Sequence, residues 1–159
     1  MEEKKLAIIA TKGTLDWAYP PFILASTASA LGYEVEIFFT FYGLQLLKKD
    51  LDLKVSPLGN PGMPMPMGMD KWFPNLLTAL PGMEAVMTAM MKKKMASKGV
   101  ASLEELRALC QEAEVRLIAC QMTVDLFDMD SSAFIDGLEY AGAARFFEFA
   151  GQSDICLYM

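Results

Sequence analysis

Cysteines are the side chains best suited to covalent chemistry in this chain, and Cys120 has the position that favours it most. Cys120 ends the apolar run at residues 115–120, which has the length and composition of a buried strand. Reactive groups of open α/β sheets gather at the carboxyl ends of strands. A short helix is predicted next, and its positive end would stabilise a thiolate or an anionic persulfide. A buried structural cysteine fits the same position, so both interpretations stay open at this point.

The other two cysteines have less favourable positions. Cys110 lies near the end of a predicted helix, where the dipole disfavours a thiolate, so position alone indicates a helix-packing residue. It could approach Cys120 only if the turn at residues 111–114 folds it back. Cys156, in the middle of a predicted strand, is expected in the core. Three cysteines without CxxC spacing indicate neither a disulfide framework nor a zinc ribbon.

The absence of histidine narrows the chemistry further. The chain contains no His at all, which excludes Ser-His-Asp and Cys-His nucleophile pairs and any His-ligated metal. Any reactive cysteine must therefore act without imidazole, and for such a cysteine we expect no metal site and no cofactor.

A methionine-rich stretch supports an alternative function. Met63, Met65 and Met67 are spaced by two among prolines and glycines, and thioethers are soft ligands suited to Cu(I). A Cu(I) or apolar-ligand binding module is therefore one alternative, and a structural subunit of an oligomeric assembly is another. The other interpretation of the stretch is a pliable apolar loop or lid at about residues 50–82.

Composition and charge restrict the partners and the compartment. The net charge of −6 disfavours nucleic acid, which needs clustered Lys and Arg. The 53% hydrophobic content indicates either extra buried surface or an apolar subunit interface, and with the second a homo-oligomer is expected. No export signal and no transmembrane segment are recognisable, which favours the cytoplasm. The basic run at residues 92–94 is interpreted as a solvated helix face, with peripheral membrane contact as the alternative.

Apolar runs alternate with helical patterns along the chain and predict the elements that position these residues. Pro20 and Pro21 are expected near the start of the first helix, and Ser102 and Glu105 have capping-box spacing. The pattern predicts a single three-layer α/β domain over residues 1–159, with a mostly parallel sheet of about five strands. The predicted strands span 5–11, 34–40, 115–120, 137–140 and 154–158, and the predicted helices span 14–31, 41–49, 83–97, 102–113, 121–127 and 143–151.

Several motifs together resemble a known family. They are TKGTLD at residues 11–16, IFFTFYGL at 37–44, ACQMTVD at 119–125 and DGLEYAG at 136–142, with the Met/Pro/Gly-rich middle between them. In this combination the chain resembles the DsrE/DsrF-like sulfurtransferase family and, more narrowly, its DsrE2-type branch. The resemblance covers nearly the whole chain.

The resemblance implies a flavodoxin-like fold, an oligomeric assembly and a cysteine that carries sulfane sulfur as a persulfide or thiosulfonate. Cys120 stands at the family's AC-x-M position and inherits the carrier role, and Cys110 resembles a second functional cysteine of this branch. Thr123 replaces the more usual Ser after that motif. A TusA-like sulfur carrier and a rhodanese are the partners that the resemblance implies.

Overall fold

The computed structural model describes residues 4–56 and 80–159. The chain divides into two compact units, one formed by Met1–Gly13, Trp17–Asp52 and Ser102–Met159, the other by Thr14–Asp16 and Leu53–Ala101. Each unit is described by itself. The single domain over residues 1–159 stays a prediction, and most of the expected loop or lid at 50–82, including the methionines at 63, 65 and 67, lies outside the described residues.

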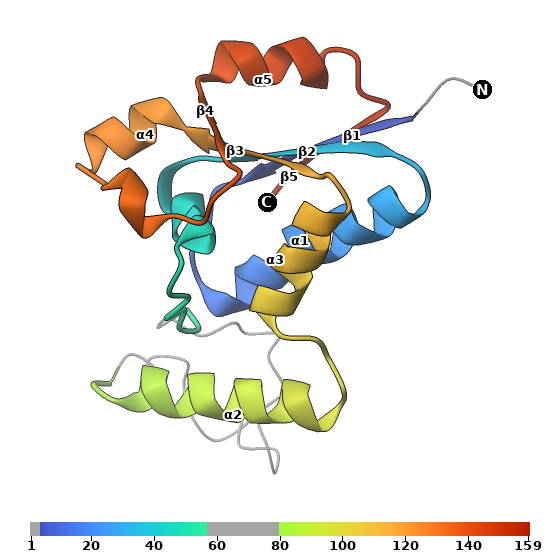
Figure 1. The fold of residues 1–159 in the computed structure, drawn as a ribbon. Helices are drawn as coiled ribbons and strands as arrows, with labels where there is room; N and C mark the ends of the chain where they lie inside the picture. The colour runs from blue at the N-terminus through green and yellow to red at the C-terminus, as the bar shows by residue number, and fades with distance from the viewer. Residues whose placement is uncertain (1–3, 57–79) are drawn as a thin grey trace. The chain divides into compact units, whose positions relative to one another are not determined.

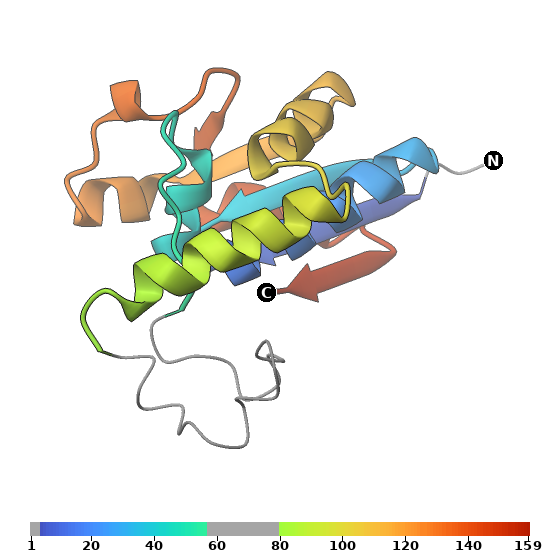
Figure 2. The same ribbon diagram turned by 90° about the horizontal axis from the view of Figure 1, so that it is seen from below.

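The larger unit is built on a five-stranded sheet in the order β4-β3-β2-β1-β5, with parallel pairing throughout. β5 forms the edge beside β1, and the carboxyl end of the chain lies there (Figure 2). The strands are β1 (Lys5–Ala10), β2 (Glu34–Phe39), β3 (Arg116–Cys120), β4 (Glu139–Ala141) and β5 (Ile155–Tyr158). The three central strands are largely buried, as their continuous apolar runs predict.

Helices cover both faces of this sheet, which confirms the three-layer α/β class (Figure 1). One face carries α1 (Leu15–Ala30) and α3 (Leu103–Glu112), and the other carries α5 (Ala143–Ala150). Neighbouring residues of β2 separate the two faces, since Phe39 packs against Phe22 of α1 and Phe38 stacks on Phe146 of α5.

A local sequence signal explains where α3 begins. Ser102 and Glu105 form the predicted capping box, with their side chains bonding each other's backbone N–H groups.

On the face of the sheet that α5 covers, Arg145 of α5 lies 2.8 Å from Glu139 of β4 and 3.4 Å from the buried carboxylate of Glu36. These ion pairs tie α5 to the sheet.

Two local predictions need correction. Pro20 and Pro21 lie inside α1 rather than near its start, because the helix begins at Leu15. The segment predicted as a helix over residues 41–49 is the 3₁₀ helix η1 (Phe41–Leu47), whose tighter turn continues directly from the end of β2. The other short elements are α4 (Gln121–Leu126) and a single 3₁₀ turn, η4 (Ser131–Ala133).

The smaller unit contains α2 (Met83–Ser97), whose bounds match the predicted helix. Hydrogen bonds join its separate segments: Leu15 N–H donates to Lys54 O at 2.9 Å, and Val55 N–H donates to Thr88 Oγ1 at 3.0 Å. Among the described residues no helix is both long and apolar enough to cross a membrane.

Candidate functional site

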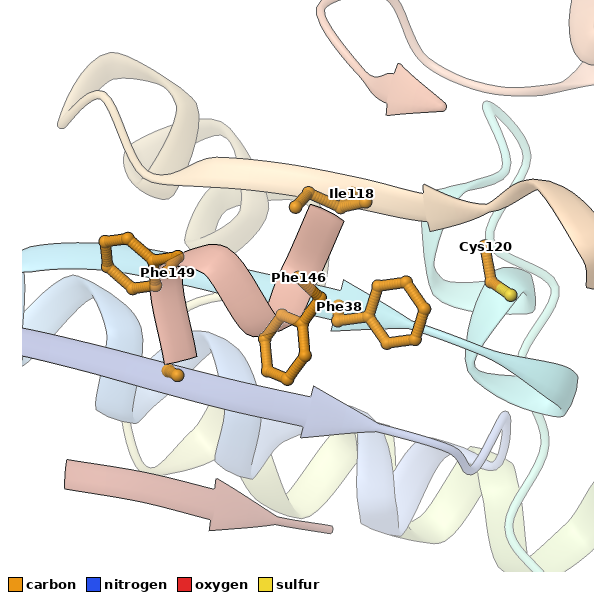
Figure 3. Close-up of a cluster of buried hydrophobic side chains, with 6 residues drawn as sticks. Phe38, Ile118, Cys120, Phe146 and Phe149 are labelled. Atoms are coloured by element: carbon orange, nitrogen blue, oxygen red, sulfur yellow. The ribbon is translucent and has the colours of Figure 1, made fainter. Parts of the chain in front are cut away.

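Cys120 is the last residue of β3 and the residue that precedes α4. Its side chain lies on the face of the sheet that α5 covers, in a buried cluster with Phe38, Ile118 and Phe146 (Figure 3). Only 3% of its surface is exposed. The pairing of Phe39 with Ala119 places Thr40, the residue that follows β2, beside Cys120 at the carboxyl edge of the sheet. A sulfur atom held here is sheltered from water but lies at the end of the strand.

Two threonines lie next to this sulfur, the buried Thr123 and the half-buried Thr40. Thr123 comes one turn after Cys120 on α4, and its hydroxyl lies 3.2 Å from that of Thr40. The N–H of Phe41 donates to Thr123 Oγ1 at 3.2 Å. Because Thr123 Oγ1 already accepts that bond, its own proton is free to point to the sulfur or to Thr40.

The hydrogen bonds to Cys120 together outweigh the effect of burial on the pKa of its thiol. Burial is the largest single influence and raises the pKa of the thiol. The hydroxyls of Thr123 and Thr40 and the backbone amides of Thr123 and Met122 act together in the opposite direction, and the pKa ends below its ordinary value. A thiolate is the nucleophilic form of cysteine, so this environment favours reactivity.

Close packing of η1 brings Thr40 to the sulfur. A Cβ on Gly43 would lie 2.1 Å from Ala10 O, so only glycine allows η1 to pack this tightly on the end of β1. Phe41 has a φ of 48°, a left-handed conformation that is strained for an aromatic residue and that accompanies its bond to Thr123. Arg107 of α3 secures the other end of η1 by donating to Leu46 O at 2.9 Å and Lys48 O at 2.6 Å.

Cys110 lies on the opposite face of the sheet. It is fully buried on α3, and its thiol donates to Phe22 O of α1 at 3.5 Å. Burial raises the pKa of Cys110 to about 11, despite a backbone hydrogen bond from Ser26 that lowers it. Phe22 packs on Phe39, whereas Cys120 shares a cluster with Phe38, so the structure does not bring the two sulfurs together.

Cys156 corrects another sequence-based expectation. It was predicted in the core, but its side chain is exposed on β5. The reason is topological, because β5 is an edge strand and most of its residues are exposed. Mid-strand position alone could not distinguish an edge strand from a central one.

Residue types alone did not identify Thr40 and Thr123 as parts of the site. Two signals could have found them: Thr40 directly follows β2 as Cys120 ends the neighbouring strand, and Thr123 stands three residues after Cys120 on a helix. The first signal depends on knowing that β2 and β3 are neighbours, because Thr40 comes from a distant part of the chain, whereas the second is local to the sequence around Cys120.

Sequence comparisons show which family and which proteins this chain is similar to. The DsrE/DsrF/DrsH-like family model matches residues 2–158. Over all 159 residues of both chains, the sequence is 81% identical to a protein of Allochromatium vinosum named Sulfur carrier protein DsrE2. It is 32% identical over 161 residues to Uncharacterized protein YrkE of Bacillus subtilis, covering 99% of this chain and 98% of that one.

One solved structure supports the fold. The crystal structure of the ychN protein from E. coli aligns with a TM-score of 0.54 and 11% sequence identity, covering 98% of this chain and 99% of that one. At this identity the likeness concerns the arrangement of strands and helices, and it agrees with the parallel sheet described above.

Proposed function

We propose that this chain, which belongs to the DsrE/DsrF/DrsH-like family, carries sulfane sulfur on Cys120 and passes it to a partner thiol. The observation that carries the proposal is the set of donors around a nearly buried sulfur, which lowers the pKa of Cys120. The name of the Allochromatium vinosum relative, Sulfur carrier protein DsrE2, supports it. A cytoplasmic location fits this proposal.

The transfer needs no oxidant or reductant from outside. In the loading step the Cys120 thiolate attacks the outer sulfur of a donor persulfide, a new S–S bond forms at Cys120, and the donor leaves as a thiolate. In the unloading step an acceptor thiolate attacks the same outer sulfur, and the electron pair of the broken S–S bond returns to Cys120. The hydroxyl groups of Thr40 and Thr123 donate hydrogen bonds that stabilise the anionic sulfur before and after each step.

Cys110 is proposed as a second functional cysteine only on the family resemblance. Its burial on the far face, with a pKa of about 11, means that Cys120 must load and unload without direct help from it. Any role of Cys110 in transfer would therefore require α1 and α3 to separate.

Partners follow from the same proposal. A carrier needs one protein that donates sulfur and one that accepts it, for which a rhodanese and a TusA-like carrier are the proposed classes. A homo-oligomer is also proposed, and the exposed apolar side chains of the edge strand β5, Ile155 and Tyr158, support it.

Mass spectrometry tests the proposed role of Cys120. The protein is incubated with polysulfide or with a thiosulfonate donor, and the adduct is located by peptide mapping. We expect one added sulfur group on Cys120 in the wild type and in Cys110→Ser, and none at residue 120 in Cys120→Ser. Equal loading of Cys120→Ser and wild type would contradict the proposal.

A further inference from the structure

The two elements that hold the Cys120 sulfur also carry large apolar side chains that face solvent. Tyr42 of η1 is 64% exposed, and Leu126 of α4 is 58% exposed. Together with their neighbours these side chains form what we call the apolar rim. Its members are Phe41, Tyr42, Met122, Leu126 and Phe127. Scattered exposed apolar residues are ordinary, but a contiguous group marks a contact surface.

Ring contacts and helix geometry make the rim contiguous. The Phe127 ring lies 6.2 Å from that of Phe41 and 6.0 Å from that of Tyr42. On α4, Met122 and Leu126 are four residues apart and share one stripe of the helix, next to the stripe that carries Phe127. η1 and α4 therefore present one apolar surface beside the strand end that holds the sulfur.

Acidic side chains border this surface. Asp125 lies on the other side of the Met122 and Leu126 stripe, and Asp128 lies two residues after the end of α4; both are exposed. Within residues 4–56 and 80–159 neither carboxylate takes part in an ion pair. Residues 41–47 and 121–128 contain no Lys or Arg. The apolar rim next to Cys120 thus has a negative border on its α4 side.

We propose that the apolar rim docks the sulfur-exchanging partner through a segment whose thiol lies between apolar side chains and is flanked by Lys or Arg. This inference rests on the proposed sulfur transfer at Cys120. Because Cys120 is nearly buried, a partner thiol can reach it only when the partner's own surface is pressed against the rim. Apolar contact then contributes affinity, and the complementary charge speeds encounter.

Synthetic peptides test this recognition without knowledge of the natural partner. The wild-type protein is loaded with polysulfide, and sulfur transfer is timed to three cysteine peptides. The first has Leu on both sides of Cys and Lys at both ends, the second exchanges Lys for Glu, and the third exchanges Leu for Ser. We expect the first to react about tenfold faster than either of the others at low salt, with the charge effect fading at high salt.

Paired variants assign the effect to the rim. Tyr42→Ser with Leu126→Ser should slow transfer to the first peptide about tenfold, and the control pair Leu31→Ser with Leu109→Ser, which changes two exposed apolar side chains outside the rim, should not. Asp125→Asn with Asp128→Asn should slow it several-fold at low salt, while Glu112→Gln with Glu114→Gln, at the amino end of β3, should leave it unchanged.

The outcomes separate this inference from the proposed function. If sulfur never loads on Cys120, the proposed function fails and the docking proposal fails with it. If sulfur loads normally but the three peptides react at equal rates, or the Glu peptide reacts fastest, only the docking proposal is overturned. It is also overturned if the Tyr42 and Leu126 pair converts a wild-type oligomer to a monomer, because the rim would then bind a second copy.

Discussion

Cys120 and Cys110 are both buried cysteines only ten positions apart in the chain, yet their surroundings have opposite effects on the thiol. Cys120 lies at a strand end among hydroxyl and amide donors, which lower its pKa in spite of burial. Cys110 lies between two helices, where burial raises its pKa to about 11. Burial therefore does not decide the reactivity of a cysteine by itself; the number of donors that reach the sulfur does.

The rate of alkylation should separate the two cysteines most strongly. At pH 7 we expect Cys120 to react with iodoacetamide at least about a hundredfold faster than Cys110, since a pKa of about 11 against the ordinary 9.0 leaves a hundredfold less thiolate. Timed labelling with peptide mapping measures both rates in one sample. Similar labelling rates for Cys120 and Cys110 would contradict the proposed difference in their surroundings.

Alkaline pH should reveal Cys110 through stability. Because its folded pKa of about 11 exceeds the ordinary 9.0, the protonated thiol favours the folded state; this contribution is complete below pH 9 and is lost as the pH rises through 11. It amounts to at most about 3 kcal/mol. Denaturant unfolding from pH 8 to 11 should show this loss in wild type and not in Cys110→Ala. Parallel pH curves would contradict the assigned environment.

Adding a single methyl group to η1 should change the reactivity of Cys120 and leave that of Cys110 unchanged. Gly43→Ala should lower the free energy of unfolding by about 2 kcal/mol, because the added Cβ overlaps Ala10 O and pushes η1, with Thr40, away from the sheet. The labelling rate of Cys120 should fall and that of Cys110 should not. Gly142→Ala, where a Cβ meets open space, is the matched control for both measurements.

Loss of one hydroxyl should give the smallest effect. Thr123→Val should raise the pKa of Cys120 and slow its labelling at pH 7 about tenfold, because a hydrogen bond to a charged group contributes about 1.5 kcal/mol. Thr123→Ser restores a hydroxyl and should recover most of the rate. The pH dependence of labelling reports the change, and an unchanged profile in the valine variant would show that Thr123 only packs.

Sequence patterns were enough to predict the parallel α/β class, the bounds of α2, the Ser102 capping box and the place of Cys120 at a strand end. These features depend on periodicity and on residues close together in the chain, where local physical preferences are strong.

Which strands are neighbours and which face each helix covers depend on the tertiary structure, and the surroundings of each cysteine follow from that arrangement. It places β2 beside β3, so that Thr40 reaches Cys120; it puts Cys110 on the far face; and it makes β5 an edge, which exposes Cys156. The acidity of a thiol depends on the donors and solvent around it in space, and for Cys120 one of those donors, Thr40, comes from a distant part of the chain.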